Sequence, residues 1–268
     1  MLAIQASSPA FSPPLVLVQT NLAISPTFTE FQRMAGKYNV IPVWTEILAD
    51  LTTPVALFNR CIGDNDGFLL ESVDRGEHWG RWSFIGGKPL ATITKESDEI
   101  RLEGSLPVVL DSKMSLLEIL SDLLDVFETP PIDDFPPLHG GLVGYLGYDI
   151  VREVENLPHV PTDDKHLPDA KLSVIGDLIA IDHWKQRAFL ISNILITDEG
   201  SEISLEEKYQ NAISRLEDLA EKGAVGSEEP LMFPTPLDED LPEVISTFQT
   251  DQFCLAVEAA KEHIIDGD

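Results

Sequence analysis

Four kinds of side chain that could bind a small charged molecule lie close together in the Gly67–Pro89 stretch. Leu70, Glu71 and Ser72 are consecutive, and Arg81 follows them after a polar turn. Glu71 could accept hydrogen bonds from an ammonium group, Ser72 could donate or accept, and Arg81 could pair with a carboxylate. Because an amino acid carries both an ammonium and a carboxylate, this stretch is a candidate amino-acid site.

The same pattern also fits a β-hairpin without a ligand, in which the aromatic side chains are core and the charges are solvated. In that case Arg81 would form a salt bridge with Glu71 or Asp74. We expect Trp79 and Trp82 to be core residues rather than ligand contacts under either interpretation.

The elements around this stretch predict an antiparallel meander in the first third of the chain. Apolar residues between Val43 and Leu51 recur with helical spacing and indicate a short amphipathic helix. Strands are expected over 55–61, over two segments of the Gly67–Pro89 stretch, and over 90–95 and 100–103. A helix over 114–127 should follow, with Ser115 and Glu118 forming a capping box and a leucine-rich face docked on the meander.

The rest of the chain predicts further strands and helices. Four glycines between Leu138 and Asp149 lack nucleotide-loop spacing, so we interpret them as positions in a strand that another backbone approaches closely. Asp149 should cap a helix over 150–157. Two apolar runs, 171–181 and 187–196, predict a hairpin. A helix over 204–222 should stop at Gly223, and a last helix capped by Thr250 should span 251–266.

Domain organisation follows from these patterns and from the composition between them. We expect a loosely ordered extension over 1–36, one domain over 37–222 and a linker rich in Gly, Pro and acids over 223–249. The segment 250–268 holds a helix with no sequence of its own to pack against. It therefore looks like the first element of a further domain that is cut off.

Composition excludes several classes of function. The 268 residues include 18 Lys and Arg against 46 Asp and Glu, a formal charge of −28, which opposes binding to nucleic acid or anionic membranes. Cys61 and Cys254 form no CxxC motif, so a metal or redox site is not expected and a reducing, cytoplasmic environment fits best. No apolar run is long enough to span a membrane. The absence of Lys and Arg before Arg33 argues against a secretory signal and makes a plastid location less suitable.

Four collinear segments resemble the large subunit of anthranilate synthase, component I. The most specific is Leu69–Ser72 followed by Gly80–Gly86. The others are Tyr38–Val43, the glycine-rich Gly140–Tyr145 with its continuation to Pro158, and Asp251–Asp268. The resemblance therefore covers nearly the whole chain from about residue 37 onwards.

The resemblance implies an α+β fold of antiparallel sheets packed with helices, a two-layer sandwich that is incomplete here. The family enzyme converts chorismate and ammonia to anthranilate and pyruvate with Mg²⁺, and a glutamine amidotransferase subunit, component II, supplies the ammonia. It opens tryptophan biosynthesis and is inhibited by L-tryptophan. Glu71 and Ser72 match family positions that contact this inhibitor. Arg81 falls where a basic residue lies near its pocket, and Leu70 could face the indole.

The same resemblance implies that this chain lacks the catalytic machinery. In the family, the Mg²⁺ ligands, the chorismate-binding residues and a Pro-Tyr-Met segment of the inhibitor pocket lie beyond the equivalent of Asp268. We therefore expect no catalytic residue and no metal ligand here. The chain alone should be inactive, with a half-built inhibitor site.

Two alternatives stay open. Aminodeoxychorismate synthase component I has the same fold but serves folate synthesis, and the intact Leu69–Ser72 and Tyr38–Val43 segments favour anthranilate synthase over it. A stand-alone amino-acid-binding module would have no enzyme attached.

Overall fold

The computed structural model describes residues 22–71, 80–104, 106, 114–158, 160, 162–196, 203–224 and 245–267. The chain divides into two compact units, Met1–Ser227 and Glu228–Asp268. The second unit contains α5 (Thr250–Asp266), which ends at Gly267 in the left-handed conformation that glycine favours there. Its N-cap residue is Gln249 rather than Thr250 and makes no capping bond through its side chain.

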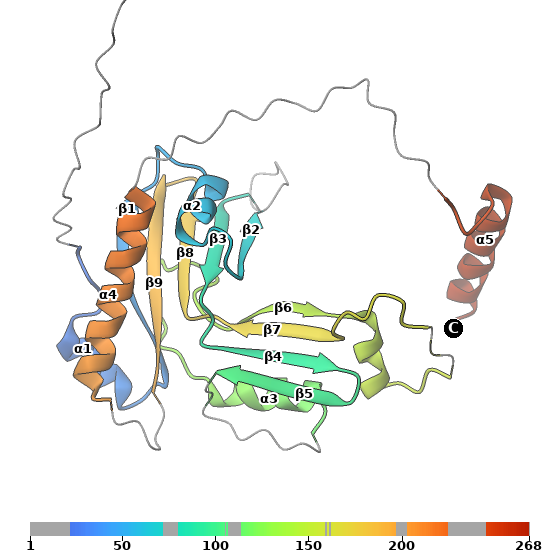
Figure 1. Ribbon diagram of the computed structural model, residues 1–268, viewed down its shortest axis with the longest axis horizontal. Helices are drawn as coiled ribbons and strands as arrows, with labels where there is room; N and C mark the ends of the chain where they lie inside the picture. Colours follow the sequence, from blue (N-terminus) through green and yellow to red (C-terminus); the bar gives the residue numbers. More distant parts are fainter. Residues whose placement is uncertain are drawn as a thin grey trace, which may run out of the picture. The chain divides into compact units, whose positions relative to one another are not determined.

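The first unit contains two antiparallel sheets (Figure 1). The five-stranded sheet has the order β1 (Val40–Leu48), β9 (Arg187–Leu195), β8 (Asp177–Asp182), β3 (Trp82–Gly87) and β2 (Gly67–Glu71). The four-stranded sheet has the order β5 (Glu99–Gly104), β4 (Ala91–Glu96), β7 (Ala170–Val174) and β6 (Leu142–Leu146). Helices pack on both sheets, so the predicted α+β class is confirmed.

Three helices pack on one side of the five-stranded sheet: α1 (Phe28–Ala35), α2 (Pro54–Cys61) and α4 (Leu205–Ala224). The core between them includes the fully buried Phe31, Leu190 and Leu216. The other side of the sheet carries an aromatic cluster, formed by Trp44, Phe68, Trp82, Phe84, Phe135 and Phe189. Both faces of this sheet are therefore lined with apolar side chains.

Helix α1 corrects the predicted extension over 1–36. Phe31 is fully buried, and the hydroxyl of Tyr209 on α4 donates a 2.7 Å hydrogen bond to the carbonyl oxygen of Pro26. Ser25 also forms an antiparallel bridge with Trp44 of β1. Residues 22–36 thus belong to the first unit, whereas residues 1–21 lie outside the described residues.

Thr27 and Glu30 form a capping box at the start of α1, and its removal should destabilise the fold. The Thr27 side chain accepts from the backbone of Glu30, whose carboxylate accepts from the backbone N–H of Thr27. Thr27→Ala should lower the free energy of unfolding by about 1 kcal/mol in urea denaturation. The exposed Thr29 on the same helix offers a control, because Thr29→Ala should change stability by less than about 0.5 kcal/mol. Equal effects would contradict the assigned helix start.

Helix α3 (Leu116–Val126) covers one face of the four-stranded sheet, with Leu116, Ile119 and Leu123 buried against Ile93. The capping box predicted for Ser115 and Glu118 is confirmed. A second acid completes this helix start. The carboxylate of Glu153 accepts 3.0 Å hydrogen bonds from the backbone N–H groups of Leu116 and Leu117.

Glu153 ends a 3₁₀ helix, η1 (Tyr148–Glu153), which is shorter than the helix predicted over 150–157. Gly147 occupies its N-cap position. Asp149 does not cap it but pairs with Arg152 at 2.6 Å. The prediction for the preceding glycines is confirmed at Gly144, where an added Cβ would lie 2.0 Å from the carbonyl oxygen of Lys171 on β7.

The chain crosses between the two sheets twice, and both crossings contradict the predicted topology. Lys88–Leu90 connects β3 to β4, so the expected meander is divided between two sheets. Ile175 and Gly176 connect β7 to β8, so the run over 171–181 is two strands. A Cβ on Gly176 would lie 3.1 Å from the carbonyl oxygen of Lys88, which shows that the crossings pack tightly on each other.

Two elements near the N-terminus have the opposite type to that predicted. The expected helix over 43–51 is β1, because Ile41, Val43 and Thr45 alternate into the helix-covered core. The expected strand over 55–61 is α2, which Thr53 caps and Pro54 begins. At the other end of the unit, α4 continues through Gly223 instead of stopping there.

Candidate functional site

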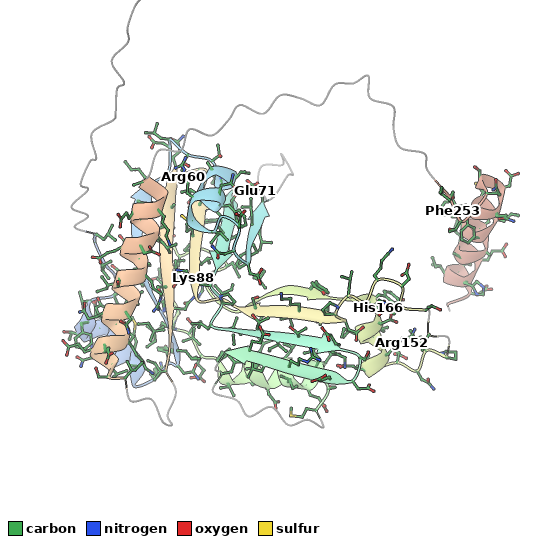
Figure 2. All side chains as sticks on the ribbon, in the orientation of Figure 1. Arg60, Glu71, Lys88, Arg152, His166 and Phe253 are labelled. Carbon is green, nitrogen blue, oxygen red and sulfur yellow. The ribbon has the colours of Figure 1, made fainter. Side chains whose placement is uncertain are left out.

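Leu70 and Glu71 lie at the end of β2, an edge strand of the five-stranded sheet (Figure 2). Both side chains are exposed, Leu70 to 42%. Successive side chains of a strand point to opposite faces, so Leu70 shares its face with Phe68 and Glu71 shares its face with Leu69. One small ligand could touch both residues by lying along the outer edge of β2. No described strand pairs with that edge.

Ser72, the third predicted contact, lies outside the described residues, as do Asp74 and Trp79. The register nevertheless shows what surrounds its neighbour. Glu71 pairs with Ser83 of β3, so these two side chains point to the same face.

Arg81 is held at the start of β3 by a partner that the sequence did not indicate. Its Nε and Nη2 donate hydrogen bonds of 3.0 and 2.6 Å to the two carboxylate oxygens of Asp182, at the end of β8. The guanidinium carbon also lies 4.9 Å from the ring centroid of Trp82 and 5.2 Å from that of Trp184. Among the described residues, Arg81 forms its ion pair with Asp182 and not with Glu71, whereas Asp74, the other expected partner, lies outside them.

Trp82 belongs to the aromatic cluster, as expected. Its ring stacks with that of Phe84 at a centroid distance of 6.2 Å and is tilted against that of Phe189 at 6.1 Å. Arg81 and its neighbours thus anchor the end of the β2–β3 hairpin to the turn between β8 and β9, close to Leu70 and Glu71.

The electrostatics of Asp182 depend on this arrangement. Burial alone would raise its pKa, but hydrogen bonds from Arg81 and from the backbone N–H groups of Lys185 and Trp184 lower the pKa below its ordinary value. The same balance holds at Glu153. Burial alone would raise the pKa of its carboxyl, but hydrogen bonds from the backbone N–H groups at the start of α3 and from Lys95 lower that pKa below its ordinary value. Both carboxyls are therefore stabilised in the charged form.

This predicts a specific pH dependence of stability. A carboxyl whose pKa is lower in the folded than in the unfolded protein stabilises the fold at pH values above its unfolded pKa, which is about 3.9 for Asp. This stabilisation is lost as the pH falls through the lower pKa of the folded state. We expect wild type to be more stable than Asp182→Asn at pH 7. The difference should shrink steadily below about pH 4.5 in urea denaturation. A difference that stays constant down to pH 2 would show that the charge of Asp182 is not responsible.

Sequence reasoning missed a second polar contact at this end of the sheet. The hydroxyl of Ser83, which is buried, lies 2.7 Å from Nε2 of His183 in the β8–β9 turn. Because Ser83 pairs with Glu71, this buried contact lies next to the end of β2. The residues are 100 positions apart, so no local spacing could have linked them.

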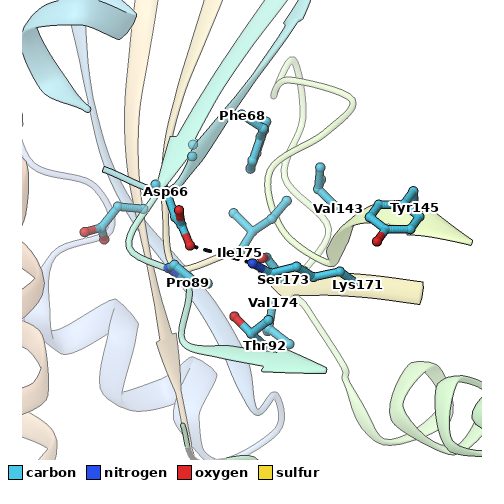
Figure 3. A pocket seen from close by; sticks show the side chains of 15 residues that line it. Asp66, Phe68, Pro89, Thr92, Val143, Tyr145, Lys171, Ser173, Val174 and Ile175 are labelled. Carbon is cyan, nitrogen blue, oxygen red and sulfur yellow. Dashed lines mark ion pairs between the residues drawn. The ribbon is translucent and has the colours of Figure 1, made fainter. Parts of the chain in front are cut away.

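A cavity of about 260 Å³ lies in the first unit, where the β2–β3 hairpin meets β6 and β7 (Figure 3). Phe68 and Gly86 form one wall, and Val143, Tyr145, Lys171 and Ser173 form the other. It lies beside the opposite end of β2 from Glu71. Of the predicted site residues that the structure describes, Leu70, Glu71 and Arg81 do not line it.

Comparison with known proteins identifies the family. The family model described as "chorismate binding enzyme" matches residues 68–268, which begin on β2 and include all the predicted site residues. The chain belongs to the family of chorismate binding enzymes.

Several similar proteins are named as subunits of anthranilate synthase. Anthranilate synthase component 1 of Acetivibrio thermocellus is 32% identical over 248 residues, 91% of this chain and 49% of that protein. The protein of that name from Mycolicibacterium smegmatis is 34% identical over 197 residues, 73% of this chain and 37% of that protein. Anthranilate synthase alpha subunit 2, chloroplastic, of Arabidopsis thaliana is 30% identical over 268 residues, 90% of this chain and 41% of that protein.

The chain spans about half or less of the length of these relatives. Among solved structures, anthranilate synthase component I from Streptococcus pneumoniae is similar with 23% identity and a TM-score of 0.42, over 82% of this chain and 45% of that chain. In the part of the chain that the structure describes, no helix is long and apolar enough to cross a membrane. The described His, Cys, Asp and Glu side chains form no group of three or more that could hold a metal ion.

Proposed function

We propose that this chain is the N-terminal, regulatory part of anthranilate synthase component I. The observation that carries the proposal is the match of about nine-tenths of the chain to proteins of that name at 31–32% identity. The complete enzyme would convert chorismate and ammonia to anthranilate and pyruvate in tryptophan biosynthesis. A glutamine amidotransferase subunit, component II, would supply the ammonia.

The regulatory role is assigned to the outer edge of β2. Glu71 accepts the ammonium group of L-tryptophan, Ser72 contributes a hydroxyl beside it, and Leu70 lies against the indole. Support comes from the exposure of Leu70 and Glu71 on an edge that no described strand covers. Bound tryptophan would favour an arrangement of the complete enzyme that binds chorismate weakly, which is a coupling between two sites.

Arg81 can take part without losing its structural bond. The hydrogen bonds to Asp182 use Nε and Nη2. A guanidinium has five N–H donors, so Nη1 could bind the carboxylate of the effector. We therefore propose that Arg81 binds the effector through Nη1 while Nε and Nη2 keep their hydrogen bonds to Asp182.

We propose that the catalytic residues of the complete enzyme are not among the residues of this chain. The complete enzyme would use Mg²⁺. The described His, Cys, Asp and Glu side chains form no group of three or more that could hold a metal ion, so we propose that other residues of the complete enzyme bind it. We place the enzyme in the cytoplasm, where the free thiols of Cys61 and Cys254 would stay reduced.

Product identification tests this proposal. A full-length version of the protein is incubated with chorismate, ammonium and Mg²⁺, and its products are separated by liquid chromatography. Anthranilate and pyruvate are the expected products, and the 268-residue chain alone should form neither. Aminodeoxychorismate would instead assign the protein to the related synthase of folate synthesis. Tryptophan binding without any chorismate conversion would indicate a stand-alone binding module.

A further inference from the structure

The cavity between the two sheets has the features of a second ligand site. It lies in the angle between the aromatic side of the five-stranded sheet and the face of the four-stranded sheet that points away from α3. In the register of β6 and β7, Val143 pairs with Ser173 and Tyr145 with Lys171. Paired side chains share a face, so all four point to the side on which Phe68 lies (Figure 3).

The wall formed by β2 and β3 consists of the ring of Phe68 and of glycines. Phe68 pairs with Gly86, and an added Cβ on Gly86 would lie 2.3 Å from the ring of Phe68. The ring can therefore lie across β3 only because residue 86 is glycine. Ile175 and Val143 continue the apolar lining. Such a surface suits a flat apolar group.

Lys171 is the positively charged side chain among the described residues that line this cavity. Its Nζ lies 3.8 Å from a carboxylate oxygen of Asp66, whose side chain is 94% exposed, so the ion pair is long and solvated (Figure 3). The other acid of the lining, Asp177, accepts hydrogen bonds from Ser192 and Arg215 at 2.6 and 3.0 Å, and Arg215 offsets its charge. Lys171 can therefore bind an anion at the mouth of the cavity.

We propose that this cavity binds a small carboxylate with a flat, apolar body. The carboxylate pairs with Lys171, and the body lies against Phe68 between the two sheets. Ser173 and Thr92, which pair across β7 and β4, also line the cavity, and their hydroxyls could hydrogen-bond a polar substituent. A volume of about 260 Å³ is just below the range of drug-sized sites, which fits a ligand the size of one aromatic ring and its acid group.

This site is separate from the described effector residues of the proposed function. The cavity contains none of Leu70, Glu71 and Arg81. Its occupation does not depend on whether the complete protein makes anthranilate. A failure of one proposal therefore leaves the other standing.

The test uses benzoate as the probe and benzamide as its uncharged match, added to the 268-residue chain while backbone amide chemical shifts are followed by NMR. Benzoate should bind saturably and shift the amides of Val143, Lys171 and Ser173. Lys171→Met should weaken benzoate about tenfold, which corresponds to the loss of one charge-assisted hydrogen bond. Benzamide should bind wild type about as weakly as benzoate binds Lys171→Met.

Two variants make the result specific. Lys88 has the same 3.8 Å distance to an exposed carboxylate, that of Asp218, but lies outside this cavity, so Lys88→Met should bind benzoate like wild type. Val143→Trp should fill the cavity and abolish binding of both probes. If its amide spectrum shows that it does not fold, Ser173→Leu replaces it. Equal affinity for both probes, no effect of Lys171→Met, shifts confined to other residues, or no saturable binding would overturn the proposal.

Discussion

Replacing Ser72 by leucine in a full-length version of the protein should raise the tryptophan concentration for half-maximal inhibition by at least about tenfold. The substitution removes a hydroxyl next to Glu71 and places an apolar side chain where the charged end of the amino acid should bind. Losing one hydrogen bond to a charged group costs roughly 1.5–3 kcal/mol, and each 1.4 kcal/mol is tenfold in affinity. Anthranilate production measured by fluorescence against tryptophan concentration checks this.

A matched control separates this effect from a general loss of stability. Ser214 is exposed on α4, on the other side of the same sheet, and Ser214→Leu should leave the inhibition curve unchanged. Activity without tryptophan should be unchanged in both variants. If Ser72→Leu is inhibited as strongly as wild type, the effector does not bind at this edge of the sheet.

Arg81→Leu should lower the free energy of unfolding by about 3 kcal/mol. The side chain of Asp182 is only 1% exposed, so removing Arg81 leaves a buried carboxylate without its counter-charge. The backbone N–H groups of Trp184 and Lys185 still reach this carboxylate, at 3.1 and 3.2 Å, and limit the loss. Urea denaturation of the 268-residue chain at pH 7 measures the change.

The neighbouring pair Arg187–Glu46 provides the control. Its N–O distance is also 2.6 Å, but both side chains are 40% exposed. Exposed ion pairs contribute little, so Arg187→Leu should cost less than about 1 kcal/mol. Similar costs for the two arginines would mean that burial of Asp182 does not control the energetics of this corner of the sheet.

Local patterns predicted the elements whose signals lie within a few residues. The capping box of Ser115 and Glu118 identified α3, and the β2 and β3 strands followed from the apolar segments on either side of a polar turn. The pattern of β1 predicts a helix because both faces of the strand are apolar. Val43 and Trp44 pack on opposite sides of the sheet, which obscures the alternation of a strand. The capping box at Thr27 and the Thr53-Pro54 pair were signals that could have revealed α1 and α2.

The candidate site was predictable only in part, because its remaining contacts are non-local. Leu70, Glu71 and Arg81 could be chosen from their types and spacing. The partner of Arg81 comes from a strand 101 residues later, and Ser83 meets His183 across a similar separation. The cavity requires two sheets that meet where the chain crosses at Lys88–Leu90 and Ile175–Gly176. The local sequence pattern instead predicts a single meander at the first crossing and a continuous strand at the second.

Hydrogen–deuterium exchange of the full-length protein, with and without L-tryptophan, tests most directly where the effector binds. We predict slower exchange in peptides that cover β2 and β3, residues 67–71 and 82–87, and unchanged exchange in β4 and β5, residues 91–104. Protection confined to β6 and β7, or no protection of β2, would contradict an effector site at the edge of the five-stranded sheet.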